Sequence, residues 1–388
     1  MYRYSRHVLR LVGALALLLL AACGSTQAAR SDAGQALQAP STAATQPAFT
    51  TSTPSLPSAV MTSVPSLPSA ATTSVPGLPS EVTTAIPSLP PATTTAMPSL
   101  PSAAATTGTR AIKTVFVIVM ENHNWSSIKG STSAPYINTT LLPMASYAEQ
   151  YYNPPGVHPS EPNYLWLEAG TNFGISNDDA PSENHQGTTQ HLVTLLSADG
   201  ISWKAYQEDI SGTVCPLKSS GLYAPKHNPM VYFDDVTGGN DPQSAACIAH
   251  ERPYAELASD LQHNTVARYN FITPNLCDDM HNSLGCATRD SVKNGDTWLS
   301  QAVPQILQSR AYADGGALFI TWDEGEGGDG PIGMIVLSPA AKGGGYANTI
   351  HYTHSATLRT IQEIFHVTPL LGDAPQSADL RDLFRTFP

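Results

Sequence analysis

The strongest constraint on the fold comes from a set of apolar, strand-like runs without regular alternation of polar residues. These runs occupy residues 114–120, 201–206, 269–274, 317–322 and 332–339. Most consist of β-branched or aromatic apolar residues, as expected for strands buried on both faces of a sheet. Helix-like segments lie between them, near residues 137–150, 160–168, 188–198, 251–262, 292–309 and 354–365. This alternation predicts an α/β fold with a mostly parallel central sheet and helices on both faces.

The chain before residue 111 differs in composition and is expected to lie outside this domain. Residues 23–110 are nearly free of charge and contain five consecutive repeats of eleven residues, of which TSVPSLPSAAT is typical. At least two prolines in every repeat exclude a helix. We therefore expect a disordered, extended stalk that carries no catalytic chemistry, followed by one large globular domain over residues 111–388.

Residues 1–22 predict export from the cytoplasm. Three arginines precede a short leucine-rich run, which ends in small residues before Cys23. The run is too short to span a membrane and is typical of a secretory signal. The small residues before Cys23 resemble a bacterial lipobox, which implies cleavage there and a lipid on the thiol. An ordinary signal with an incidental cysteine is the alternative. We expect a cell-envelope lipoprotein, anchored through Cys23 in the outer membrane or at the cell surface.

Four further cysteines suggest two disulfides, since the protein is expected to be exported. They are Cys215, Cys247, Cys277 and Cys286. Three pairings are possible, and we favour Cys215 with Cys247 and Cys277 with Cys286 because short local loops are the simplest arrangement. A zinc site made of cysteines is disfavoured, because the chain has no pair spaced as C-x-x-C.

The charge of the domain limits its partners. The whole chain has a net charge of −12, and five basic and two acidic residues precede residue 111, which leaves 14 basic and 29 acidic residues in the domain. This excess of acid argues against nucleic-acid binding. If the substrate is an anion, a metal ion or a helix N-terminus must offset the repulsion locally. We expect a monomer.

Acidic residues and histidines follow three of the predicted strands. Glu121 and Asn122 come directly after the first strand, and Asp323 and Glu324 directly after residues 317–322. The run after residues 269–274 contains Asp279, with His281 two positions later. Asp and Asn are also common in turns, which is the simpler explanation for any one strand end. Three such ends favour one or two divalent metal ions: Ca²⁺, Mg²⁺, Mn²⁺ or Zn²⁺.

The stretch HPSEPNYL, residues 158–165, raises a separate question. A serine before Glu-Pro and an apolar run is typical of a helix start, where serine is a favoured N-cap. The same place suits a nucleophile, because helix N-terminal N–H groups favour a phosphate and an alkoxide. We interpret Ser160 as both. His158 is expected either to orient Ser160 or to pack the turn.

Six blocks in order along residues 111–388 resemble the bacterial and fungal phosphoesterase family. They are VFVIVMENHNW, HPSEPNYLWLEAGT, KHNPMVYF, ITPNLCDDMHNS, LFITWDEGEGG and HYTHSATLRTIQEIF. This family includes acid phosphatases and phosphatidylcholine-type phospholipases C and belongs to the alkaline-phosphatase-like superfamily. The resemblance implies an alkaline-phosphatase-like fold and a phosphoesterase catalytic domain over residues 111–388.

The resemblance also implies roles for individual residues. Four match the family's first metal ligands: Glu121, Asn122, Asp323 and Glu324. Ser160 matches the nucleophile, Asn163 resembles an asparagine that holds a phosphate oxygen in the nucleotide pyrophosphatase branch, and His227 resembles a family active-site histidine. Three residues lie where relatives with two metals keep the second site: Asp279, His281 and His354.

These roles predict metal-dependent hydrolysis of phosphate esters through a phosphoserine on Ser160. A metal ion would lower the pKa of the serine and polarise a phosphoryl oxygen. One of His281, His354 and His227 would protonate the leaving oxygen, because histidine titrates near working pH. We favour an acid-phosphatase-like phosphomonoesterase. The alternatives are a phospholipase C or phosphodiesterase using the same site, and a non-catalytic surface-display module on a stalk.

Overall fold

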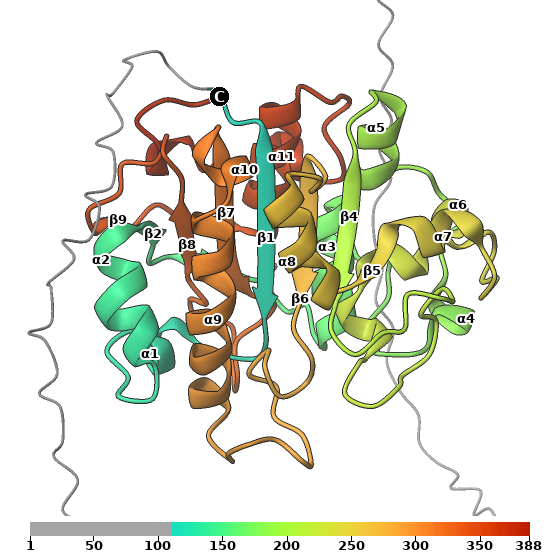
Figure 1. The fold of residues 1–388 in the computed structure, drawn as a ribbon, viewed down its shortest axis with the longest axis horizontal. Helices are drawn as coiled ribbons and strands as arrows, with labels where there is room; N and C mark the ends of the chain where they lie inside the picture. Colours follow the sequence, from blue (N-terminus) through green and yellow to red (C-terminus); the bar gives the residue numbers. More distant parts are fainter. Residues whose placement is uncertain (1–110) are drawn as a thin grey trace, which may run out of the picture. The chain divides into compact units, whose positions relative to one another are not determined.

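The computed structural model describes residues 111–388, which form an α/β domain around an eight-stranded sheet (Figure 1). The predictions about the signal segment, the lipid on Cys23 and the repeats concern residues 1–110 and lie outside the described residues. The order of the strands is β5-β4-β6-β1-β7-β8-β2-β9. All of them run in one direction except β8, which is antiparallel to both of its neighbours. The predicted mostly parallel sheet is therefore confirmed.

The strands of the main sheet are short at its edges and longest at its centre. Their bounds are β1 (Thr114–Met120), β2 (Ser146–Ala148), β4 (Trp203–Gln207), β5 (Glu251–Pro253), β6 (Tyr269–Thr273), β7 (Gly316–Trp322), β8 (Met334–Leu337) and β9 (Tyr346–Asn348). A second, two-stranded sheet pairs β3 (Tyr151–Tyr152) with β10 (Tyr352–Thr353). The central strands β6 and β7 are buried at every position, and β1 at every position but its first. Their uninterrupted apolar sequences fit a location between two helical layers.

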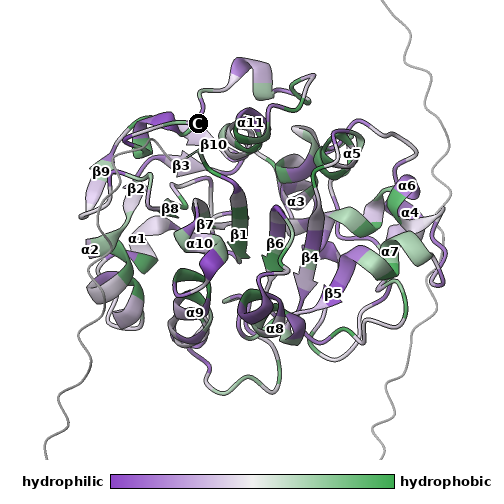
Figure 2. Ribbon diagram, turned by 45° about the horizontal axis from the view of Figure 1, so that its top comes forward, coloured by the Kyte–Doolittle hydropathy of each residue, from purple (hydrophilic) through white to green (hydrophobic). Residues whose placement is uncertain are grey.

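Helices cover both faces of the sheet, as predicted. Figure 2 shows α8 and α9 on one face and α3, α5 and α11 on the other. The longer helices are α3 (Ser160–Ala169), α5 (Leu192–Ala198), α7 (Ala245–His250), α8 (Ala255–His263), α9 (Ser291–Leu307) and α11 (His354–Phe365). The short ones are α1 (Trp125–Ile128), α2 (Leu142–Met144), α4 (Pro181–Asn184), α6 (Asp234–Thr237) and α10 (Arg310–Ala313). Single turns are η1 (Ile137–Leu141), η2 (Pro225–His227), η3 (Pro229–Tyr232), η4 (Ala374–Gln376) and η5 (Arg381–Leu383).

The helix predicted over residues 137–150 is partly wrong. Helical backbone covers only η1 and α2, and the chain then enters β2. The helix predicted over residues 251–262 is also partly wrong, because its first residues form β5 and the helix α8 begins at Ala255. β2 pairs with both β8 and β9, so the rest of the sheet decides its conformation.

Three neighbouring strands bring their carboxyl ends to one edge of the sheet. β1 lies between β6 and β7 and is parallel to both, with Ile118 opposite Ile272 and Met120 opposite Trp322. The residues that follow these strands must therefore emerge side by side. This is the edge at which open α/β sheets bind their ligands.

Two disulfides close local loops, Cys215 with Cys247 and Cys277 with Cys286. The favoured pairing is confirmed, and such bonds are typical of exported proteins. Among residues 111–388, no helix has the length and apolar character needed to cross a membrane.

Candidate active site

Glu121 lies at the centre of the site, directly after β1, and is fully buried. Its Oε1 accepts a hydrogen bond from Tyr164 Oη (2.6 Å), and its Oε2 accepts one from Ser160 Oγ (3.1 Å). Burial raises the pKa of the Glu121 carboxyl well above its usual range, and the nearby carboxylates of Asp323 and Asp279 raise it further. A negative charge here needs a cation close by.

Asp323 reaches the same place from β7. Its Oδ1 accepts the backbone N–H of Asn122 (2.9 Å), which adopts a left-handed conformation with a φ of 52°. Its Oδ2 is buried and has no hydrogen-bond partner within residues 111–388. Burial, followed by repulsion from Glu324, raises the pKa of Asp323 to about 7. The Asn122 side chain contacts the other carboxylate of the site, because its Nδ2 donates to Glu121 Oε2 (3.0 Å).

Asp279 and His227 complete the buried part of the cluster. The backbone carbonyl of Asp279 accepts the Glu121 N–H (2.7 Å), which joins the loop after β6 to the end of β1. His227, from η2, stands between two carboxylates, with Nδ1 3.1 Å from Asp279 Oδ2 and Nε2 3.3 Å from Glu121 Oε2. Burial, together with the charge of Lys226, lowers the pKa of His227 well below its usual value.

These side chains fit a divalent cation. One possible ligand atom from each of Glu121, His227 and His281 lies within 4.8 Å of the others. Oxygen and imidazole donors together suit borderline ions such as Zn²⁺ or Mn²⁺. The unpartnered Asp323 Oδ2 and the mutual repulsion of the buried carboxylates indicate the same need for positive charge. His227, expected only as an active-site histidine, joins the group of possible ligands.

Ser160 is the first residue of α3, and Pro159 occupies the N-cap position. The serine hydroxyl therefore does not cap the helix but donates to Glu121 Oε2. Fewer backbone N–H groups in the first turn of α3 are free than predicted. The N–H of Glu161 donates to Asp178 Oδ1 (3.0 Å), and Pro162 has none.

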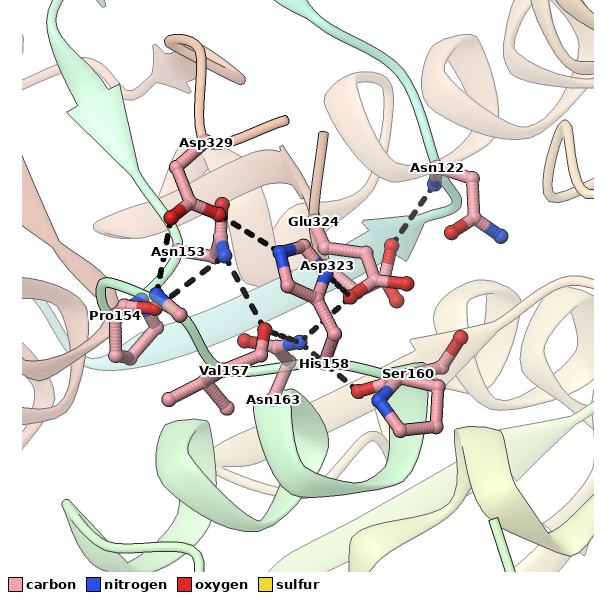
Figure 3. A network of polar contacts seen from close by, with 12 residues as sticks. Asn122, Asn153, Pro154, Val157, His158, Ser160, Asn163, Asp323, Glu324 and Asp329 are labelled. Atoms are coloured by element: carbon pink, nitrogen blue, oxygen red, sulfur yellow. Dashed lines mark hydrogen bonds and ion pairs between the residues drawn. The ribbon is translucent and has the colours of Figure 1, made fainter. Parts of the chain in front are cut away.

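The side chain of Asn163, expected to hold a phosphate oxygen, contacts other groups of the protein in this structure. Its Nδ2 lies within hydrogen-bond distance of Val157 O (3.0 Å), Pro159 O (3.1 Å) and Glu324 Oε2 (3.1 Å) (Figure 3). The donors predicted for a phosphate oxygen are thus engaged with the protein. In this conformation Asn163 holds the loop before Ser160 and orients Glu324.

His354 is not directed into the site either. Its Nε2 lies 2.6 Å from the backbone carbonyl of Asp323, and its Nδ1 lies 3.2 Å from Tyr151 Oη. Burial lowers the pKa of His354 to about 4, so the ring is neutral. With both nitrogens engaged, this histidine supports the turn that carries Asp323 and has no free nitrogen for a metal ion or a leaving oxygen.

His158 links Glu324 to the glycine-rich segment that follows β7. Figure 3 shows its ring between the two carboxylates of Glu324 and Asp329. Nδ1 contacts Glu324 Oε2, and Nε2 lies 2.7 Å from Asp329 Oδ1. The two expected roles were to orient Ser160 or to pack the turn. The ring instead contacts Glu324, a predicted metal ligand, and Asp329.

Two polar groups of the site were not predicted. Tyr164, one turn after Ser160, donates to Glu121, and its ring stacks on His227 with centroids 5.3 Å apart. Lys226 lies beside His281, with Nζ 3.4 Å from Nε2 of that ring. The available signal was the KHNP motif, in which a lysine precedes the expected histidine.

A comparison with family models identifies the relatives of this chain. The model of the phosphoesterase family matches residues 147–368, more than half of the chain. The chain belongs to the phosphoesterase family. The family and the enzyme class expected from the six blocks, a phosphoric ester hydrolase, are therefore confirmed. The matched range includes Ser160, Asp279 and Asp323 and begins after Glu121.

Individual relatives are distant. A phosphatidylinositol-3-phosphatase of Mycobacterium tuberculosis is 28% identical over 271 residues, which cover 70% of this chain and 82% of that protein. A phosphate-repressible acid phosphatase of Penicillium chrysogenum is 29% identical over 174 residues, covering 44% of this phosphoesterase and 39% of the fungal protein. Among solved structures, a protein in the alkaline phosphatase superfamily from Vibrio parahaemolyticus has a TM-score of 0.48 and 12% identity, with 72% of each chain covered.

Proposed function

We propose that this phosphoesterase is a metal-dependent, acid-phosphatase-like phosphomonoesterase that works through a phosphoserine on Ser160. The observation that carries the proposal is the 3.1 Å contact between Ser160 Oγ and Glu121 Oε2, in a cluster of buried carboxylates at three strand ends. A structural serine in a helix start needs no such cluster. A nucleophilic serine needs both an acceptor for its proton and a cation for the phosphoryl group.

Five residues would hold the metal ion: Glu121, Asn122, Asp323, Glu324 and His227. This leaves His281 for proton transfer. When bound, the ion would neutralise charge on the phosphoryl group and favour the alkoxide form of the serine. The second metal site, expected around Asp279, His281 and His354, is less well supported, because His354 faces elsewhere. We therefore propose one metal ion.

The chain's own residues would carry the remaining steps. Ser160 Oγ attacks phosphorus while the ester P–O bond breaks, and Glu121 Oε2 is the nearest acceptor for the hydroxyl proton. His281 would protonate the leaving oxygen, because its side chain is partly exposed whereas those of His227 and His354 are buried. Water then hydrolyses the phosphoserine, which releases phosphate and restores Ser160.

The choice between monoesters and diesters is tested by parallel assays on one preparation. The substrates are a nitrophenyl phosphate monoester, the corresponding diester, phosphatidylinositol 3-phosphate and phosphatidylcholine. We expect the two monoesters to give the highest kcat/KM. The Mycobacterium relative, a phosphatidylinositol-3-phosphatase, motivates the lipid monoester. Dominant turnover of the diester or of phosphatidylcholine would instead favour the phosphodiesterase or phospholipase C alternative.

A non-catalytic display module is the remaining alternative. It predicts no hydrolysis of any of these substrates with any divalent ion. The packed serine, carboxylates and histidines argue against it, because buried charged groups are costly to keep without a use.

We also propose that residues 1–22 are a lipoprotein signal, that Cys23 carries the lipid, and that residues 23–110 join this membrane anchor to the catalytic domain. Mass spectrometry of the membrane fraction tests this. An acylated N-terminal Cys23 is expected, and an unmodified mature chain in the soluble fraction would contradict it.

A further inference from the structure

Lys226 occupies an unusual position for a lysine in this acidic domain. It precedes His227 in η2, and its side chain is only 22% exposed. Its ammonium group lies 2.9 Å from Asp178 Oδ2 and 3.4 Å from His281 Nε2. A lysine usually extends into water. Here two side chains from other segments hold its charged end over the site.

Two independent chains of contacts link Lys226 to Ser160. Asp178 accepts Lys226 on one oxygen and, on the other, the N–H of Glu161, the residue after Ser160. On the other side, His281 contacts Lys226 and belongs to the compact group that contains Glu121, the hydrogen-bond acceptor of Ser160. On each of these two routes, two residues lie between the ammonium group and Ser160.

Lys226 brings a positive charge to the edge of a cluster of buried carboxylates. A lysine is an ammonium group near neutral pH, and here the Asp178 carboxylate holds it in one place.

We propose that Lys226 binds a non-bridging phosphoryl oxygen and makes the site selective for phosphomonoesters over phosphodiesters. The inference rests on the proposed function and adds the residue that sets the substrate class. Asp178 is a positioning residue, since it holds the ammonium group and does not itself contact the phosphoryl group.

The selectivity follows from the charge of the substrate. A phosphomonoester carries a second negative charge that a diester lacks, and that charge resides on a non-bridging oxygen. A fixed ammonium group in a partly buried site attracts the dianion more strongly than the monoanion. In a domain with 14 basic and 29 acidic residues, a dianion without such a group would be repelled.

The test compares two substrates in variants of the full chain. Lys226→Met removes the charge and keeps most of the stem, Lys226→Arg keeps the charge, and the exposed Lys293→Met serves as the matched control. For each variant, kcat/KM is measured at saturating metal ion with the nitrophenyl monoester and the nitrophenyl diester. Inhibition by inorganic phosphate reports binding apart from turnover, and thermal melting reports folding.

We expect Lys226→Met to lower kcat/KM for the monoester by about 10- to 100-fold, the range of a hydrogen bond to a charged group, and to raise the phosphate inhibition constant similarly. The diester should change by less than about threefold. Lys226→Arg should keep most of the selectivity, and Lys293→Met all of it. Asp178→Asn should raise KM for the monoester more than it lowers kcat, because it loosens the lysine.

The outcomes separate this inference from the proposed function. An active wild type whose monoester-to-diester ratio is unchanged by Lys226→Met overturns the role of Lys226 and leaves the hydrolase intact. The same holds if both substrates lose activity equally. A wild type that hydrolyses neither substrate overturns the proposed function itself. If Lys226→Met has a lowered melting temperature, the monoester-to-diester ratio of Lys226→Arg and the phosphate inhibition constant still test the role of Lys226.

Discussion

The Ser160 hydroxyl points out of the first turn of α3 toward the Glu121 carboxylate. In an ordinary helix start the same hydroxyl would accept an N–H from its own turn. Here the first helical turn serves to present the oxygen, and the surrounding carboxylates give it a partner. A hydroxyl held beside a carboxylate oxygen is the geometry that the proposed nucleophile needs.

Ser160→Ala should abolish turnover without unfolding the protein. We expect a fall in kcat on the order of 10³-fold or more, as found when a nucleophile is removed from an enzyme. The measurement is hydrolysis of the nitrophenyl monoester, with mass spectrometry of acid-quenched wild type to detect one added phosphoryl group on the Ser160 peptide. The exposed Ser182→Ala is the control. Retention of more than a tenth of the activity in Ser160→Ala would exclude the phosphoserine mechanism.

Tyr164→Phe should weaken metal binding. The phenol donates to Glu121 Oε1 at 2.6 Å, so its loss frees a predicted ligand to rotate. Groups that orient metal ligands typically contribute 10- to 100-fold in affinity or activity, and we expect roughly that loss. Calorimetric titration with each divalent ion measures it, and Tyr312→Phe, on the far side of the sheet in α10, is the control. Unchanged metal affinity in Tyr164→Phe would mean that the Glu121 carboxylate does not bind the metal ion.

At the scale of secondary structure, the sequence predicts where the site lies. It does not predict which partners the side chains of the site contact. Apolar runs without alternation identify β1, β6 and β7, and parallel pairing then brings Glu121, Asp279 and Asp323 to one edge. The conformation of a side chain depends on tertiary partners that no local pattern encodes. That is why His354, which starts α11 next to the site, turns to a backbone carbonyl instead.

The errors in the elements have a similar cause. The helix expected over residues 137–150 stops at Met144, because the following residues gain more from pairing with β8 and β9 than from helical propensity. The sequence gives no reason to single out Lys226, because most lysines are solvated. Only the fold brings Asp178, from a loop after α3, to its ammonium group.

Far from the site, His191 joins three helices. At the N-terminus of α5, its Nδ1 lies 3.0 Å from Glu168 Oε1 of α3, and its Nε2 lies 3.0 Å from Asp235 Oδ1 of α6. The ring also stacks on Phe233, with centroids 3.8 Å apart. Burial alone would lower the pKa of His191, but the hydrogen bonds to both carboxylates raise it overall. For the Glu168 carboxyl, burial has the opposite effect and raises the pKa.

This arrangement predicts greater stability in mild acid. A raised folded-state pKa stabilises the protein below the ordinary value of about 6.5 for histidine, and that stabilisation is lost as pH rises through the folded value. Asp235 has a lowered pKa, so its contribution is present above its ordinary value and is lost in stronger acid. His191→Gln should lower the free energy of unfolding by roughly 3 kcal/mol at pH 5, because Glu168 loses its buried partner, and by less at pH 8.

Denaturant unfolding of wild type and His191→Gln at the two pH values measures the difference. The exposed His263→Gln is the control, because its ring is hydrogen-bonded to Ser259 within α8. Equal destabilisation at pH 5 and pH 8 would show that the ring acts by packing and not by its charge.

For the molecule as a whole, the acidic charge of the domain leads us to expect that a bound cation contributes to stability as well as to chemistry. Removal of divalent ions with a chelator should abolish hydrolysis and lower the melting temperature, because the buried carboxylates then repel one another. Activity should return with Ca²⁺, Mg²⁺, Mn²⁺ or Zn²⁺, and titration should give one ion per chain. Full activity after exhaustive chelation would contradict a metal-dependent mechanism.

The expected separation of the catalytic domain, residues 111–388, from residues 23–110 leads to a further prediction. A fragment of residues 111–388 contains the whole described sheet, both disulfides and the site. It should fold in an oxidising host and hydrolyse the soluble monoester with the kcat/KM of the full chain, since residues 23–110 are expected to contribute no catalytic chemistry. A large loss of kcat/KM in a correctly melting fragment would assign these residues a catalytic part.

The central position of β1 has one more consequence, for amide hydrogen exchange. The N–H of Glu121 is bonded to Asp279 and that of Asp323 to Met120, both within the most deeply buried part of the sheet. Short edge strands such as β5 and β9 can open and close without disturbing them. The protons on these two amides should therefore be among the last to exchange with deuterated water, so that local fluctuations at the edges of the domain leave the acids beside Ser160 in place.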